Sequence, residues 1–141
     1  MSAPVERLIH DGRQLVAHER TGERVRGWPE EAYESIRAIN HLTNTGLSIP
    51  APVVYRVLGD LKMAVGALPQ ALEQMGDGLK RSLESPTIEV TDSKGDPRTS
   101  VAEARRRFAQ ATEHLQRARI ALEQAQVAIN SQGYEDVEDD Q

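Results

Sequence analysis

The sequence lacks cysteine and has few aromatic residues. None of the 141 residues is cysteine, which excludes both a disulfide framework and a thiolate metal site. Only 4% of the residues are aromatic although 38% are hydrophobic, so we expect a core of aliphatic side chains, as in packed helices. Enzyme pockets usually draw on more aromatic side chains than this, and we expect no enzymatic activity.

Long apolar runs are missing as well. No stretch approaches the roughly 20 apolar residues of a membrane-spanning helix, and charged residues interrupt the N-terminal segment in which a signal peptide would lie. The 17 basic and 22 acidic residues give a net charge of −5, which provides no general attraction to nucleic acid or to anionic membranes. We therefore expect a cytoplasmic protein that does not bind a membrane.

What the sequence does contain is two long heptad patterns. Apolar residues recur at alternating steps of four and three, which is typical of the seam between coiled-coil helices. In the second pattern, large residues alternate with alanine, so that a partner helix can approach closely at each alanine. The first pattern comprises Val54, Leu58, Leu61, Val65, Leu68, Leu72, Met75 and Leu79, and the second comprises Val101, Ala104, Phe108, Ala111, Leu115, Ala118, Leu122, Ala125 and Ile129.

These patterns predict an all-α fold, a bundle of three to four helices built on a long antiparallel, coiled-coil-like hairpin. The segment before the hairpin contains a polar linker at 21–27, and its first helix could instead be a β-hairpin that turns at Asp11-Gly12. We expect one domain at 1–133 and a disordered acidic tail at 134–141. The predicted helices are 4–18, 29–45, 52–83 and 100–131.

Two local signals refine the long helices. Ser100 and Glu103 have the spacing of a capping box, which predicts a helix that starts at Ser100. Pro69 lies inside the preceding helix and removes one backbone hydrogen bond, so we expect a kink near residues 65–68.

Some apolar residues lie off the predicted seam. Val57 falls on a second apolar line of the first long helix, and Ile120 and Val127 point away from the seam of the second. Trp28, the one tryptophan, precedes a helix and could either pack locally or anchor a partner. We assign these four residues to a candidate partner surface, covered either by the N-terminal helices or by another chain.

An alternative is an accessory DNA-binding regulator. Arg105 to Arg107 could contact phosphate groups from the solvated face of their helix. The segment 41–58 also resembles the turn and recognition helix of helix-turn-helix regulators, although Pro50 and Pro52 stand where that pattern has helix. The resemblance implies contact with DNA, and nucleic acid is thus a possible but not favoured partner.

No residues stand out for catalysis, for a cofactor or for a metal. The four histidines are not paired at the three- or four-residue spacing of helical metal sites, and no glycine-rich phosphate loop is present. We expect neither cofactor nor small-molecule substrate. The sequence predicts a small, non-enzymatic adaptor or assembly component that acts through a protein partner or through self-association.

Overall fold

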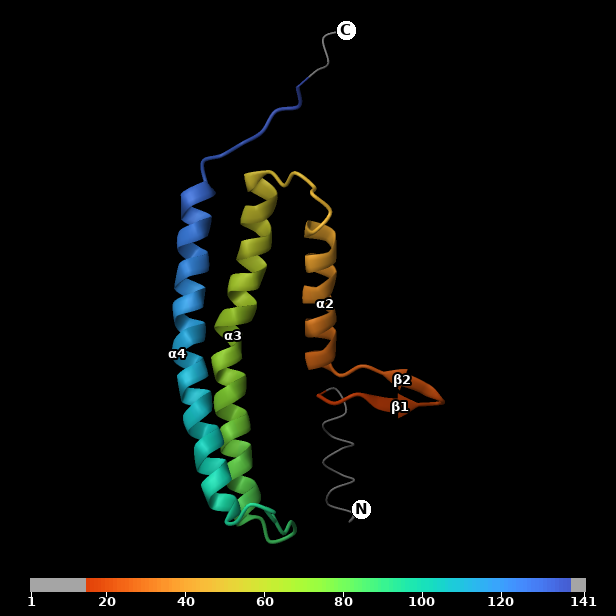
Figure 1. The fold of residues 1–141 in the computed structure, drawn as a ribbon, viewed down its shortest axis with the longest axis vertical. Helices are drawn as coiled ribbons and strands as arrows, with labels where there is room; N and C mark the ends of the chain where they lie inside the picture. Colours follow the sequence, from red (N-terminus) through yellow and green to blue (C-terminus); the bar gives the residue numbers. More distant parts are fainter. Residues whose placement is uncertain (1–14, 138–141) are drawn as a thin grey trace. The chain divides into compact units, whose positions relative to one another are not determined.

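The computed structural model describes residues 15–137 and confirms the all-α class (Figure 1). Within this range, three helices and one two-stranded sheet belong to two compact units, which divide between Ser48 and Ile49. Whether residues 1–133 act as one domain stays a prediction. Most of the predicted helix 4–18 and the end of the predicted tail, residues 138–141, lie outside the described residues.

The first unit contains a β-hairpin that the sequence did not predict at this position. Strands β1 (His18–Arg20) and β2 (Glu23–Val25) pair antiparallel, with His18 opposite Val25. Thr21 and Gly22 join them with φ angles of 50° and 80°, and two positive φ angles are typical of the tightest hairpin turns. The prediction of a linker at 21–27 is therefore wrong, because β2 lies within it. The predicted helix 4–18 does not extend to His18, which begins β1.

Helix α2 (Trp28–Thr43) follows the hairpin, close to the predicted range 29–45. Pro29 is in its first turn, where a missing amide proton costs no hydrogen bond, and Glu30 and Glu31 face the positive end of the helix dipole. Both guanidinium Nη atoms of Arg24 donate to the Glu30 carboxylate at 2.8 Å, which joins strand β2 to the start of the helix.

The second unit is the predicted helical hairpin. Helix α3 (Ala51–Glu84) and helix α4 (Pro97–Ile129) pack against each other along their length, close to the predicted ranges 52–83 and 100–131. Helix α4 starts three residues before the expected capping box, because the Asp96 carboxylate accepts a 2.9 Å hydrogen bond from the Arg98 amide. Ser100 instead donates to the carbonyl of Pro97, so the predicted capping box is wrong.

The contact between α3 and α4 follows the predicted seam along only part of its length. Val54, Leu58, Leu61, Val65 and Leu72 of α3 are half-buried, as are most of the predicted seam residues of α4. The prediction is wrong at three α3 positions that are exposed, namely Leu68, Met75 and Leu79.

The reason is that a straight helix has 3.6 residues per turn, so a strict heptad pattern rotates by about 20° per repeat away from its partner. Pro69 and Gly76, one position beyond Leu68 and Met75, lie closer to α4 instead. The helix is continuous through Pro69, and α3 changes direction near its middle (Figure 1).

The hairpin buries very little. Among the described residues, no hydrophobic side chain is fully buried, and Gln126 is the one buried polar residue, at 6% exposure. Two helices in contact along one line leave most of their apolar surface open, whereas stable domains enclose a core between at least two layers. The position of the remaining apolar surface is therefore the feature of this unit that bears on function.

Candidate interaction surface

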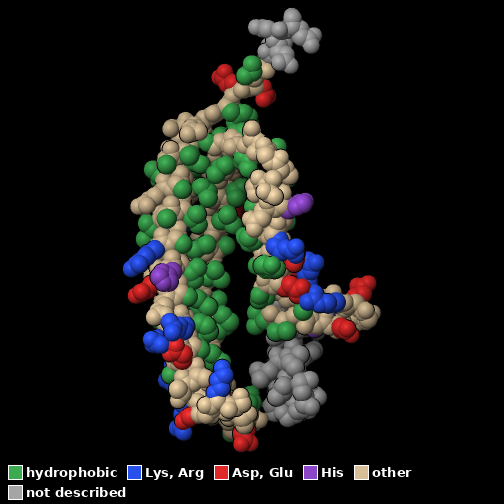
Figure 2. Space-filling model, in the orientation of Figure 1, with side chains coloured by type: hydrophobic (Ala, Val, Ile, Leu, Met, Phe, Trp, Pro, Cys, Tyr) green, Lys and Arg blue, Asp and Glu red, His purple; other side chains and the backbone are tan. Residues whose placement is uncertain are grey.

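One side of the hairpin is a continuous apolar surface, which we call the apolar face. Residues three and four apart on a helix share one side, and the α3 residues of this row include Leu68 and Met75, which are 47% and 53% exposed. Figure 2 shows hydrophobic side chains gathered along α3 and α4 with few charged groups among them. The apolar face consists of Val53, Val57, Ala64, Leu68, Ala71, Met75 and Leu79 of α3 and Ala104, Ala111, Ala118 and Ala125 of α4, none of which is charged.

The two helices contribute different shapes to this face. Helix α3 presents mainly large side chains, which form a ridge, whereas α4 presents an alanine at every seventh residue from Ala104 to Ala125, which forms a furrow. An exposed apolar surface of this length is uncommon on monomeric proteins and marks sites of protein contact.

The register of the hairpin is fixed by glycines of α3 that receive long side chains of α4. The Gln126 Nε2 atom donates a 2.8 Å hydrogen bond to the backbone carbonyl of Tyr55, and it would lie 3.2 Å from a Cβ atom added at Gly59. One heptad further along, the Arg119 side chain crosses Gly66, where an added Cβ would lie only 2.8 Å from its Cδ atom. These contacts set which residues of α3 and α4 lie at the same level.

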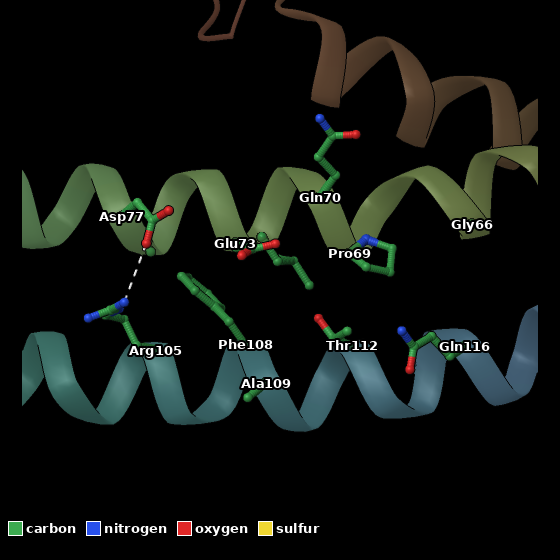
Figure 3. Close-up of a pocket in the computed structure, with 12 residues that line it drawn as sticks. Gly66, Pro69, Gln70, Glu73, Asp77, Arg105, Phe108, Ala109, Thr112 and Gln116 are labelled. Atoms are coloured by element: carbon green, nitrogen blue, oxygen red, sulfur yellow. Dashed lines mark hydrogen bonds and ion pairs between the residues drawn. The ribbon is translucent and has the colours of Figure 1, made fainter.

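The opposite side of the hairpin carries a groove of about 570 Å³ that is lined by both polar and apolar residues. Figure 3 shows its walls, with Glu73 and Asp77 on α3 and Arg105 and Thr112 on α4. The Arg105 Nη2 atom lies 3.3 Å from the Asp77 Oδ1 atom, and both side chains are close to half exposed. Ion pairs this accessible to water contribute little to stability.

All three arginines of the predicted phosphate-contact cluster have carboxylate neighbours. Arg105 contacts Asp77, and both Arg106 and Arg107 donate to the Glu103 carboxylate, Arg107 from its Nε atom at 2.9 Å. The hydrogen bonds from Arg106 and then from Arg107 hold the pKa of Glu103 below its ordinary value. Any phosphate group would therefore have to compete with these carboxylates for the arginines.

The helix-turn-helix-like segment 41–58 extends from one compact unit into the other. Helix α2 ends at Thr43 and α3 begins at Ala51, with Gly46 at a φ of 74° between them. The seven residues between the helices exceed the three or four of the DNA-binding motif, which agrees with the departure noted at Pro50 and Pro52.

The residues predicted for a partner surface are all exposed, but the three on the hairpin do not share one side of it. Val57 belongs to the apolar face and is 38% exposed. Ile120 and Val127, 49% and 62% exposed, continue the row of α4 that lines the groove through Gln116, and they therefore lie on the other side of the hairpin. Trp28 belongs to the first unit and is 62% exposed.

The sequence pattern had placed Leu68 and Met75 inside the seam, so it missed the two most exposed large residues of the apolar face. The signal that could have found them is the pair Pro69 and Gly76. A glycine one position after an apolar residue leaves room for a neighbouring helix to approach there, and a proline inside a helix changes the direction of the helix. The structure therefore adds Leu68 and Met75 to the four residues that the sequence predicts for a partner surface.

The described part of the chain shows no cluster of histidine, aspartate or glutamate side chains that could hold a metal ion. Within the same residues, no helix combines the length and the hydrophobicity needed to cross a membrane.

Fold and surface together define an all-α chain with a helical hairpin and one open apolar face. No protein-family model matches the sequence, and the comparisons with curated proteins and with solved structures found no similar protein.

Proposed function

We propose that this chain is a small, non-enzymatic adaptor or assembly component that acts by protein–protein contact through its apolar face. The observation that carries the proposal is the exposure of Leu68 and Met75, at 47% and 53%, in a hairpin that buries no hydrophobic side chain among the described residues. Covering such a row removes apolar surface from water, which stabilises an interface by about 25 cal/mol per Å² before the costs of association are subtracted.

The composition of the face supports the same role. Interface centres are depleted in charged residues and enriched in large apolar ones. All seven α3 residues of the apolar face are apolar, whereas Arg107 and His114 stand between the alanines of its α4 row. Helix-on-helix packing is the natural way to cover it, because the row repeats at the heptad spacing. Coiled-coil packing and a cytoplasmic location stay predictions. The DNA-binding alternative gains no support from the arginine cluster, since each of its members already has a carboxylate neighbour.

Site-specific photocrosslinking tests the proposal. Photoreactive benzoylphenylalanine replaces Leu68 in one purified variant and Gln74 in a matched control, since Gln74 is an exposed residue of the same helix outside the apolar face. Both are irradiated in lysate of the source organism, once untreated and once treated with nuclease, and the attached peptides are identified by mass spectrometry.

We expect a defined protein adduct from position 68 and none from position 74. Equal labelling at both positions, or no adduct at either, would show that the apolar face is not a contact surface. An adduct that disappears when nuclease is present would support the DNA-binding alternative.

A further inference from the structure

We propose that the partner that covers the apolar face is a second copy of this chain, so that two hairpins form a four-helix bundle. This inference rests on the proposed function and names the occupant of the same surface. The arguments are the length of the face, its area and the fit of its ridge to its own furrow.

The length of the face favours another hairpin. From Val53 to Leu79 the row covers 26 residue steps, or roughly 39 Å at a rise of 1.5 Å per residue. Helix α2, with 16 residues, is roughly 24 Å long and would leave more than a third of the row open. The hairpin of a second copy has, by construction, the full length of the face.

The area of the face matches what a stable dimer needs. Two helices whose axes lie 8–10 Å apart present a surface about 18 Å wide, and a surface about 39 Å long and 18 Å wide covers roughly 700 Å². Standard protein interfaces bury about 800 Å² per partner. Each copy therefore offers close to a standard interface before any contribution of the first unit.

The register of the hairpin makes the face complementary to itself. Since Gly59 contacts Gln126 and Gly66 contacts Arg119, a step forward along α3 is a step backward along α4. This places Leu68 within one residue of the level of Ala118, and Met75 within one residue of the level of Ala111. A large residue of α3 thus stands level with an alanine of α4 at these two positions.

A two-fold axis parallel to the helices makes use of this alternation. Such an axis keeps every residue at its level and places α3 of one copy over α4 of the other, so Leu68 lies over the partner copy's alanine furrow at Ala118, and the reverse contact forms at the same time. Closed two-fold contacts of this kind are the commonest arrangement in soluble oligomers. All neighbouring helices in the bundle are then antiparallel, as in many four-helix bundles.

Light scattering on the full chain is the first test. We expect a particle of twice the 15.6 kDa chain mass and a melting temperature that rises with chain concentration, because dissociation accompanies unfolding. Leu68→Glu and Ala118→Glu each place two carboxylates in the dimer interface, and we expect each to raise the dissociation constant more than about 100-fold. The controls Gln74→Glu and Gln124→Glu add the same charge at exposed positions outside the face and should leave the mass at twice the chain mass.

A crosslinking experiment does not depend on whether the charged variants fold. The chain has no cysteine, so Leu68→Cys and Ala118→Cys can be prepared as separate single-cysteine proteins, mixed under conditions that allow exchange, and oxidised. We expect disulfide-linked dimers in the mixture, at a level well above that of a mixture of Gln74→Cys and Gln124→Cys.

A monomer mass at all concentrations would overturn the second copy. Two further readouts then separate the alternatives. If the monomer's melting temperature falls with Leu68→Glu, its apolar face is covered by its own first unit. If the monomer instead photocrosslinks to a different protein from position 68, the proposed function stands and the partner is that protein. A dimer whose mass does not respond to Leu68→Glu or Ala118→Glu would also overturn the inference, because its interface would lie elsewhere.

Discussion

The contact of Gln126 with Gly59 predicts that Gly→Ala, which usually stabilises a helix, does not stabilise the protein at position 59. In the middle of an exposed helix, Gly→Ala stabilises by about 1 kcal/mol, because alanine loses less backbone entropy on folding. Gly78 provides the reference, since a Cβ atom there meets nothing closer than 3.8 Å. We therefore expect Gly78→Ala to increase the free energy of unfolding by about 1 kcal/mol.

At Gly59 the added Cβ atom would lie 3.2 Å from the Gln126 Nε2 atom, which itself is held 2.8 Å from the Tyr55 carbonyl. Moving Gln126 by a few tenths of an ångström weakens a hydrogen bond whose net contribution is about 1 kcal/mol. The two effects oppose each other and are of similar size. Gly59→Ala should therefore leave the free energy of unfolding nearly unchanged, although the same substitution at Gly78 stabilises.

A double-mutant cycle isolates the contact. In a Gln126→Ala background the obstacle is gone, and Gly59→Ala should then stabilise by about 1 kcal/mol, as at Gly78. Urea unfolding followed by circular dichroism at equal chain concentration measures all four proteins, and a difference of this size corresponds to about 4–8 °C in melting temperature for a unit of this length. If Gly59→Ala stabilised the wild-type chain as much as Gly78→Ala does, the reasoning about the hairpin register would be refuted.

Four further predictions concern the hairpin and its ends. Asp96→Ala should lower the melting temperature and Ser100→Ala should not, because Asp96 rather than Ser100 caps α4. The hydrogen bond from the Arg98 amide lowers the pKa of the Asp96 carboxyl. The stabilisation by Asp96 should therefore be complete above the ordinary aspartate pKa and disappear as the pH falls through the lowered pKa of Asp96. Melting temperatures of the wild type and of Asp96→Ala, measured over a series of pH values, check this. Leu115→Ala should destabilise by about 2 kcal/mol, the lower end for buried leucine, because Leu115 is half-buried; an unchanged urea midpoint would contradict this. Truncation after Gly133 should leave the circular dichroism of the helices unchanged, and a loss of cooperative unfolding would show that the tail packs.

Parts of the candidate surface could be predicted from the sequence. The position of Val57 beside the seam predicts a partner surface, and Val57 belongs to the apolar face. The sequence predicts the same surface for Ile120 and Val127, but their helical row continues the groove side of α4. A sequence pattern gives the direction of a side chain only relative to its own helix, and it does not say on which side of the hairpin that direction falls.

The sequence by itself determined the presence of two long helices and their pairing, because heptad spacing, proline near helix starts and the polar segment between the helices are local properties of the chain. It did not determine which apolar residues the pairing would enclose. Pro69 bends the first long helix, the 3.6-residue turn rotates the heptad row, and Gly59 and Gly66 admit Gln126 and Arg119. These contacts join residues about 50 to 70 positions apart in the chain, so their outcome depends on how two complete helices fit together, and only the tertiary structure decided that Leu68 and Met75 would face outward.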